Sequence, residues 1–169
     1  MHTFLYPFPQ GRLLLGKSER GLCFVHYVRP GKDIRRILDS LPGEPTSIME
    51  DREPFSREIE LFDRYFAGEA EDFRSLKLDI IFGTPSQRRV WTEARKIPYG
   101  QTAAYRDIAL RMHHRGYRFI GQAMNKNPYL IVIPCHRVIG ADGGLGGFGA
   151  GLELKRFLLR VEGVIISSD

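Results

Sequence analysis

The arrangement of apolar residues in the first part of the chain constrains the fold more than any other feature. Between Phe4 and Val28, three short apolar runs are separated by the turn sequences Pro-Gln-Gly and Ser-Glu-Arg-Gly. Short apolar runs joined by tight turns are typical of neighbouring antiparallel strands. We therefore predict a small antiparallel meander over this segment.

Helical spacing follows the predicted meander. Apolar residues recur every three or four positions within residues 34–38 and 55–66, which predicts a short helix and a longer one. The longer helix is entered after Pro54 and ends at Gly68. Apolar and polar residues then alternate from Phe73 to Phe82, and this period of two predicts a strand.

A turn at Gly83-Thr-Pro-Ser separates this mixed half from a mainly helical one. The turn can cap the helix that follows it, because a threonine side chain accepts hydrogen bonds from free amides at a helix start. Further short helices are predicted over residues 105–112, 118–125 and 152–161. The first two are joined by the tight turn at 113–116 and form a candidate helix-turn-helix, a pair that also occurs as simple packing in many helical domains.

These patterns predict an α+β fold with a domain boundary near residue 83. Residues 1–82 would form a small antiparallel sheet with helices, and residues 83–169 a mostly helical second domain. A chain of 169 residues is long enough to bury a core in one ordinary domain or two small ones.

The composition, 43% hydrophobic and 27% charged, is that of a globular protein. No apolar stretch nears the roughly 18 residues of a membrane span, and the N-terminus lacks the pattern of a signal peptide. We therefore expect a cytoplasmic protein, nuclear if the organism has a nucleus, that acts as a monomer and does not associate with membranes. The net charge of +5 favours a polyanionic partner, although the basic residues are spread along the chain.

The sequence around Cys135 is the strongest indication of a reactive side chain. Cys135 ends an apolar run that begins at Tyr129 and reads as a buried strand, and His136, Arg137 and a glycine-rich stretch follow it directly. Positive charge beside a thiol lowers its pKa, and glycines let a ligand approach the main chain. The alternative is that Cys135 is one more small buried apolar residue, which is the reading we adopt for the second cysteine, Cys23.

Several motifs lie around this cysteine in the second half of the chain. They are Ile133-Pro-Cys-His-Arg-Val138, Gly146-Gly-Phe-Gly149 and Leu158-Leu-Arg-Val-Glu-Gly163, preceded by Gly83-Thr-Pro, Val90-Trp91 and Ile97-Pro-Tyr-Gly100. Together they closely resemble the O6-alkylguanine-DNA alkyltransferase family, the methylated-DNA–protein-cysteine methyltransferases. The resemblance implies a ribonuclease-H-like N-terminal domain and a winged-helix-like C-terminal domain. It also implies a suicide reaction, in which one protein molecule accepts one alkyl group and is not regenerated.

Four residues are expected to carry the transfer. Cys135 is the nucleophile, because a thiolate is polarizable and displaces a leaving group readily at saturated carbon. His136 accepts the thiol proton directly or through water, and Glu162 orients the imidazole and balances its charge. By resemblance, Tyr105 donates a hydrogen bond to the departing guanine, on which negative charge develops. Arg137 is expected to tie the cysteine loop or the domains together.

A base inside a duplex cannot reach this thiol, so the guanine must be rotated out of the stack. By resemblance, Arg118 at the start of a recognition helix is the candidate finger that fills the gap. Tyr117 and Phe119 are further wedges or core residues; the family often has a small residue where this chain has Phe119. By resemblance, three further residues of the same helix are expected to contact the DNA: Gly121, Gln122 and Asn125.

The resemblance also implies a pocket for the alkyl group and the base. Its expected lining is Val138, Phe148, the backbone of Gly149, and Asn127, which precedes a proline and is expected mainly to brace a turn. Phe148 stands where an aromatic residue of the family is often a tyrosine. No metal-ligand spacing occurs, and we expect no metal and no cofactor.

The sequence therefore predicts a single-turnover DNA repair enzyme, a methylated-DNA–protein-cysteine methyltransferase. Its partner is double-stranded DNA that contains O6-alkylguanine or, less readily, O4-alkylthymine. Two alternatives remain open: a module that binds alkylated bases without repairing them, and an unrelated cysteine hydrolase. A pure binder would lack the reactive cysteine, and a hydrolase would leave the helix-turn-helix unexplained.

Overall fold

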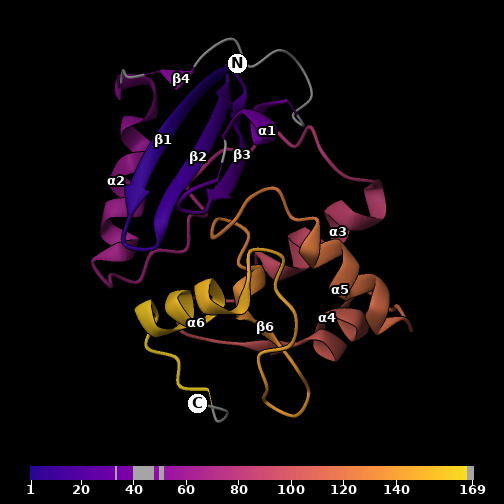
Figure 1. The fold of residues 1–169 in the computed structure, drawn as a ribbon. Helices are drawn as coiled ribbons and strands as arrows, with labels where there is room; N and C mark the ends of the chain where they lie inside the picture. Colours follow the sequence, from indigo (N-terminus) through magenta and orange to yellow (C-terminus); the bar gives the residue numbers. More distant parts are fainter. Residues whose placement is uncertain (33, 40–47, 50–51, 167–169) are drawn as a thin grey trace.

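A computed structural model describes residues 1–32, 34–39, 48–49 and 52–166 of the chain (Figure 1). Its strands are β1 (His2–Phe8), β2 (Gly11–Ser18), β3 (Gly21–Val28), β4 (Ile48–Met49), β5 (Ala103–Ala104) and β6 (Val138–Ile139). Its α-helices are α1 (Ile34–Leu38), α2 (Ser56–Phe66), α3 (Pro85–Ala94), α4 (Tyr105–Arg111), α5 (Tyr117–Asn125) and α6 (Leu152–Val161). Two short 3-10 helices are η1 (Glu53–Phe55) and η2 (Cys135–Arg137). The α+β fold is confirmed.

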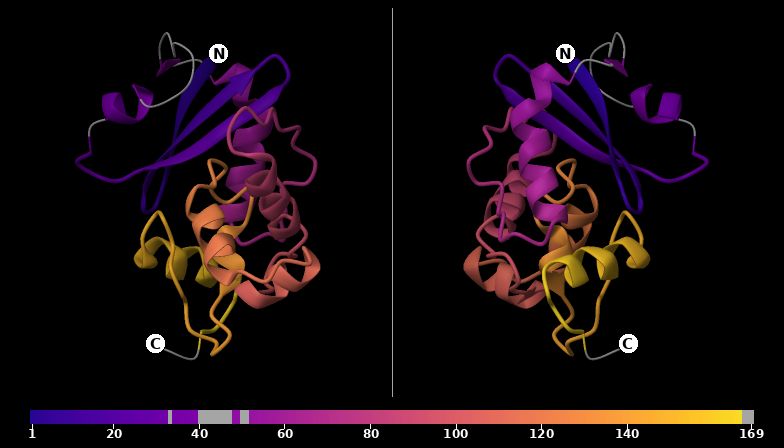
Figure 2. Two further views of the ribbon diagram at one scale, coloured as in Figure 1. Left: turned by 90° about the vertical axis from the view of Figure 1, so that its right-hand side faces the viewer. Right: turned by 90° about the vertical axis from the view of Figure 1, so that its left-hand side faces the viewer.

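The predicted meander is present, with β1 and β3 pairing antiparallel on either side of β2. The two-residue strand β4 adds to the other edge of β1 in parallel, which the sequence did not reveal. Leu13 and Leu15 of β2 face the core beneath α2, whereas Leu14 faces a smaller cluster with α1. The sheet is thus covered on both faces, and Figure 2 shows α1 and α2 on opposite sides of it.

The predicted strand from Phe73 to Phe82 is wrong. The segment forms only one isolated bridge, between Leu22 and Leu78, and its first residue has a positive φ of 55°. Leu76 is buried, which accounts for the apolar pattern. Alternating burial reports which side of a segment faces the core, and it does not require a neighbouring strand that pairs along the whole length.

The second half begins with the capped helix that the sequence predicts. Thr84 and Gln87 form a reciprocal capping box at the start of α3, so free amides are satisfied at this end. The buried Trp91 of α3 donates its Nε1–H to the carbonyl of Ala123 in α5, at 2.8 Å. The helix-turn-helix is formed by α4 and α5, and the short parallel pair β5 and β6 lies beside it.

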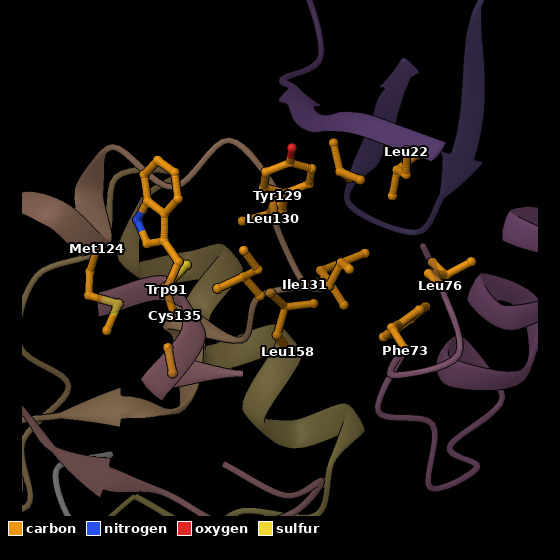
Figure 3. Close-up of a cluster of buried hydrophobic side chains, with 14 of the residues drawn as sticks. Leu22, Phe73, Leu76, Trp91, Met124, Tyr129, Leu130, Ile131, Cys135 and Leu158 are labelled. Atoms are coloured by element: carbon orange, nitrogen blue, oxygen red, sulfur yellow. The ribbon is translucent and has the colours of Figure 1, made fainter. Parts of the chain in front are cut away.

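One continuous apolar core joins the two halves of the chain. In Figure 3, Leu22, Phe73 and Leu76 from the first half lie on one side of Ile131, and the second-half residues surround its other side. Cys135 lies in the same cluster, so the loop that carries it is held by both halves. No helix within the described residues is long and apolar enough to cross a membrane.

Replacing Trp91 with phenylalanine tests the link between α3 and α5. We expect Trp91→Phe to lower the free energy of unfolding by about 2–3 kcal/mol, because it removes a buried hydrogen bond and leaves a small cavity. Urea denaturation measures the change, and Thr92→Ala on the exposed face of the same helix should stay within about 0.5 kcal/mol of the unmodified protein. Equal effects of the two substitutions would contradict a specific role for the indole.

Candidate active site

The loop that delivers Cys135 is a series of buried tight turns, so the predicted strand from Tyr129 to Pro134 is wrong. Ile131 has a positive φ of 71°, which an extended strand does not allow. The amides of Val132 and Ile133 donate to the carbonyls of Leu130 and Tyr129, at 2.9 Å each. A short apolar run shows burial, but the period of its residues cannot distinguish a strand from a compact turn.

The N-terminal sheet holds this loop in place. The amide of Val25 in β3 donates to the carbonyl of Pro128 at 2.8 Å, and the amide of Leu130 donates back to Val25 at 3.1 Å. The cysteine loop therefore continues the edge of β3 by two hydrogen bonds. Through this contact the first half of the chain positions the loop that carries Cys135.

Cys135 opens into a cavity of about 900 Å³ between the two halves. The second half contributes most of the predicted pocket residues, and the first half contributes the end of β3 and the loop after it. The lining residues that matter below are Cys135, Asn125, Asn127, Phe148, Gly149 and Arg29. A cavity of this size is within the range of small-molecule and cofactor sites, so it has room for a purine base with its alkyl group.

Cys135 is 5% exposed, and its sulfur accepts a hydrogen bond from the Asn127 amide at 3.2 Å. Asn127 also donates to the carbonyl of Ile133 at 2.9 Å and accepts from the amide of Tyr129 at 2.9 Å, so it braces the turn and contacts the sulfur. Burial raises the pKa of the Cys135 thiol, and the Asn127 hydrogen bond and the charge of Lys155 only partly oppose it. The thiol pKa is therefore raised on balance, and the cation that lowers it is Lys155 rather than the arginine that follows the cysteine in sequence.

The side chains of His136 and Arg137, which follow the cysteine, interact with Glu162 rather than with the sulfur. His136 Nε2 lies 2.6 Å from Glu162 Oε1, and Arg137 donates its Nε–H to Oε2 at 2.8 Å and an Nη2–H to Oε1 at 3.0 Å. Arg137 also donates to the carbonyl of Ile97 at 2.7 Å, so it ties the cysteine loop to the loop before β5. All three side chains of this ionic cluster are buried.

The protonation of this cluster decides which nitrogen of His136 is basic. Burial disfavours the Glu162 carboxylate, but the hydrogen bonds and charges of His136 and Arg137 outweigh it and lower its pKa to about 2. Burial lowers the pKa of His136, and the hydrogen bond and charge of Glu162 only partly oppose this, which favours the neutral imidazole. Because an ionised Glu162 can only accept, Nε2 carries the proton and Nδ1 is left as the basic nitrogen. Among the described residues Nδ1 has no hydrogen-bond partner.

Lys155 of α6 is a residue of the site that sequence reasoning missed. It is fully buried, and its ammonium donates to the carbonyls of Val138 at 2.6 Å and of Leu145. Burial lowers its pKa to about 8. The sequence does contain a sign of it, because Lys155 lies on the inward face of α6 beside Leu158, where a charged residue needs buried partners.

The other predicted pocket residues differ in whether they line the cavity. Phe148 and Gly149 line the cavity, and Gly149 packs so closely on α5 that an added Cβ would lie 3.1 Å from the carbonyl of Asn125. Val138 is fully buried behind the cavity and does not line it. Tyr105 is half-buried and donates its hydroxyl to the carbonyl of Gly147 at 3.0 Å, which places it at the glycine-rich loop.

The predicted DNA-contacting residues lie along α5. Arg118 is exposed in its first turn, and Tyr117 beside it is 59% exposed. Phe119 is half-buried, and the centroid of its ring lies 5.0 Å from that of His114 in the preceding turn. The bulky ring therefore packs against the protein itself. The remaining predicted contacts are the half-buried Gly121 and the exposed Gln122 and Asn125.

Cys23 lies in a different environment from Cys135. It is buried in β3, its Sγ is 3.8 Å from a carboxylate oxygen of Asp79, and burial raises its pKa. A nearby carboxylate further disfavours a thiolate. Within the described parts of the chain, no group of three or more histidine, cysteine, aspartate or glutamate residues is arranged to hold a metal ion.

Two family models match the chain and cover nearly all of it. Residues 1–80 match the ribonuclease-like domain of 6-O-methylguanine DNA methyltransferase, and residues 85–164 match its DNA binding domain. A methylated-DNA–protein-cysteine methyltransferase of Methanosarcina acetivorans is 38% identical over 164 residues, covering 96% of this chain and 99% of the relative. One of Haemophilus influenzae is 36% identical over 93% of this chain and 83% of the relative.

Solved structures agree with this similarity. The Mycobacterium tuberculosis OGT structure in complex with DNA is 35% identical, with a TM-score of 0.79 over 96% of this chain and 92% of that one. The O6-methylguanine-DNA methyltransferase of Pyrococcus kodakaraensis is 25% identical, with a TM-score of 0.75 over 96% of this chain and 99% of that one. The chain therefore belongs to the O6-alkylguanine-DNA alkyltransferase family, the 6-O-methylguanine DNA methyltransferases.

Proposed function

We propose that this protein repairs double-stranded DNA by transferring the alkyl group of O6-alkylguanine, and less readily of O4-alkylthymine, to Cys135. The observation that carries the proposal is the position of Cys135 at a cavity of about 900 Å³, with its sulfur hydrogen-bonded to Asn127. His136, the next residue in sequence, is paired with the buried Glu162. The protein acts once, because a thioether is not hydrolysed under ordinary conditions. It needs no metal or cofactor for this displacement.

The reaction balances with the groups present. His136 Nδ1 takes the proton of the Cys135 thiol, directly or through water, and Glu162 stabilises the imidazolium that forms. The sulfur attacks the alkyl carbon, so a sulfur–carbon bond forms as the bond from carbon to O6 breaks. The electron pair of that bond stays on the guanine, which the proton held by His136 finally neutralises. Tyr105, by turning from Gly147 to the base, is the donor for its developing charge.

Transfer of a labelled alkyl group separates this function from its alternatives. A duplex that carries labelled O6-methylguanine should leave one label on each protein molecule in a single burst, with the label on Cys135 by peptide mass spectrometry. A module that only binds alkylated bases would retain the duplex without becoming labelled. A cysteine hydrolase would turn over repeatedly and release the label to solvent, and either of these results would overturn the proposal.

The helix-turn-helix supplies the surface for DNA. Exposed arginines gather on α4, on the turn and on α5, at positions 106, 111, 115 and 118. Such a cluster can neutralise several phosphates of a duplex, which gives affinity without sequence preference. We assign Arg118 to the gap that the flipped guanine leaves in the stack, with Tyr117 beside it against the opened bases and Gln122 and Asn125 facing the duplex further along α5.

Arg118→Ala should slow repair of O6-methylguanine in a duplex by about tenfold or more, because the open stack loses the side chain that fills it. Free O6-benzylguanine needs no flipping, so its reaction with Cys135 should be nearly unchanged. Single-turnover rates on the two substrates at saturating concentrations measure both effects.

Arg115→Ala is the matched control, because it removes an equally exposed charge from the turn before α5. Each substitution should weaken duplex binding with a change of about 1 or less in the salt slope. Only Arg118→Ala should slow the duplex reaction once the DNA is saturating. Equal slowing on the free base and the duplex would assign Arg118 to support of the fold.

We further propose that the chain divides near residue 83 into the domains 1–82 and 83–169. The family models support this, since their matches end at residue 80 and begin again at residue 85. The lack of a membrane-spanning helix in the described residues is compatible with action in the cytoplasm, or in a nucleus if the organism has one. The monomeric state is likewise proposed, since one chain contains the whole cavity.

A further inference from the structure

A tyrosine from the N-terminal half reaches the ionic cluster beside Cys135. Tyr65 near the end of α2 donates its hydroxyl to Glu162 Oε1 at 2.8 Å, the same oxygen that binds His136 Nε2 at 2.6 Å. The Tyr65 oxygen also lies 3.4 Å from that imidazole nitrogen. This contact joins residues 97 positions apart and crosses the boundary between the two halves.

The hydroxyl is held as a hydrogen-bond donor to Glu162. Tyr65 is fully buried, and burial together with the negative charge of Glu162 raises its pKa well above the ordinary value. Its ring is fixed by Phe73, at 5.4 Å between ring centroids, and by Tyr99, at 6.0 Å. A neutral phenol in a rigid apolar setting is a fixed hydrogen-bond donor to the carboxylate.

Two further elements, η2 and the loop before β5, also donate to the carboxylate. From η2, Arg137 binds both carboxylate oxygens; from the loop before β5, the amide of Gly100 donates to Oε2 at 3.1 Å. The hydroxyl of Tyr99 instead donates to the carbonyl of Val161 at 2.8 Å, and Lys155 of α6 adds positive charge near His136. Among the described residues, Tyr65 is therefore the one side chain from the first half of the chain that donates to Glu162.

We propose that Tyr65 is a positioning residue for alkyl transfer, by which the N-terminal half sets the orientation and basicity of the Glu162–His136 pair. Its hydroxyl competes with the imidazole for the charge of Oε1. When the Tyr65 hydroxyl donates to Oε1, the Glu162 carboxylate stabilises a protonated His136 less than it would without this hydrogen bond. His136 therefore remains neutral down to a lower pH. The inference rests on the proposed function, since it assigns the fall of the transfer rate at low pH, the acid limb of the pH profile, to protonation of His136.

Tyr65→Phe removes only the hydroxyl and keeps the packed ring. Without this donor Glu162 attracts the imidazolium more strongly, so the pKa of His136 rises and the acid limb should move to higher pH by about 0.5–1 unit. At the midpoint pH of the unmodified protein, the rate should fall about two- to fivefold, and the two profiles should converge at alkaline pH. Single-turnover transfer from free O6-benzylguanine, measured from pH 4.5 to 9, gives both profiles without a contribution from DNA.

Tyr6→Phe is the matched control. Tyr6 donates its hydroxyl to Asp63 of the same helix α2 at 2.7 Å and packs on Phe66 of that helix, but it does not reach Glu162. It should leave the midpoint of the acid limb in place even if it lowers the melting temperature as much as Tyr65→Phe does. Its result thus separates loss of the hydrogen bond to Glu162 from general loosening of α2.

The outcomes are distinguishable. A shifted midpoint in Tyr65→Phe alone supports the inference. A lower rate at every pH without a shift, a shift in both variants, or coincident profiles would overturn it and leave Tyr65 as a core residue. Absence of transfer by the unmodified protein at any pH would instead overturn the proposed function.

Discussion

Cys135→Ala should abolish alkyl transfer entirely, while duplex binding stays within a few-fold of the unmodified protein. The sulfur forms the new bond, and no other thiol is placed to replace it. Affinity comes mainly from contacts with phosphates, which this substitution does not touch. Transfer is measured with a labelled O6-methylguanine duplex, and binding by titration of the same duplex at fixed salt.

Cys23→Ala provides the control, because it also removes one buried thiol. Cys23 lies beside Asp79 in β3, where both burial and the carboxylate raise its pKa, so its loss should leave transfer unchanged. The fold should tolerate Cys135→Ala, since Asn127 keeps its hydrogen bonds to Ile133 and Tyr129. Any label retained by the Cys135→Ala protein would contradict the assignment of the acceptor.

The fold was predictable where local sequence and packing agree. The meander, α2 and the capped helix α3 each have a period and a turn or cap that favour one structure. The segments 73–82 and 129–134 misled the prediction, because buried apolar runs need not pair with strands. Positive φ values at Phe73 and Ile131 depend on the surrounding packing and leave no mark in the sequence.

The site was predictable to the extent that its residues are close in sequence or carry a motif. Cys135 and His136 follow from the motif, and Glu162 from the resemblance. What the sequence could not show is which charge reaches the sulfur. Arg137 is two positions from Cys135 along the chain but is bound to Glu162, whereas Lys155 acts on the sulfur from α6. Tyr65 reads only as a core residue, because nothing local indicates that its hydroxyl meets a carboxylate across the two halves.

His136→Ala should slow transfer at pH 7 by about 10²-fold, because the buried thiol loses the base that takes its proton. The pKa of Cys135 is raised above its ordinary value, so at neutral pH only a small fraction of the thiol ionises unaided. That fraction grows about tenfold with each pH unit below the thiol pKa, since hydroxide replaces the resident base. The rate of the variant should therefore climb steeply from pH 7 to 9.

The unmodified protein should show a much flatter profile over the same range, because the lowered pKa of His136 already favours the neutral imidazole at pH 7. The two rates should thus converge as the pH rises, which a general loss of structure would not produce. His2→Ala removes an exposed histidine at the start of β1 and should follow the unmodified protein throughout. Single-turnover rates with free O6-benzylguanine measure all three proteins. Slowing by His136→Ala to the same degree at every pH would mean that His136 holds the loop in place, and the proton would then need another acceptor.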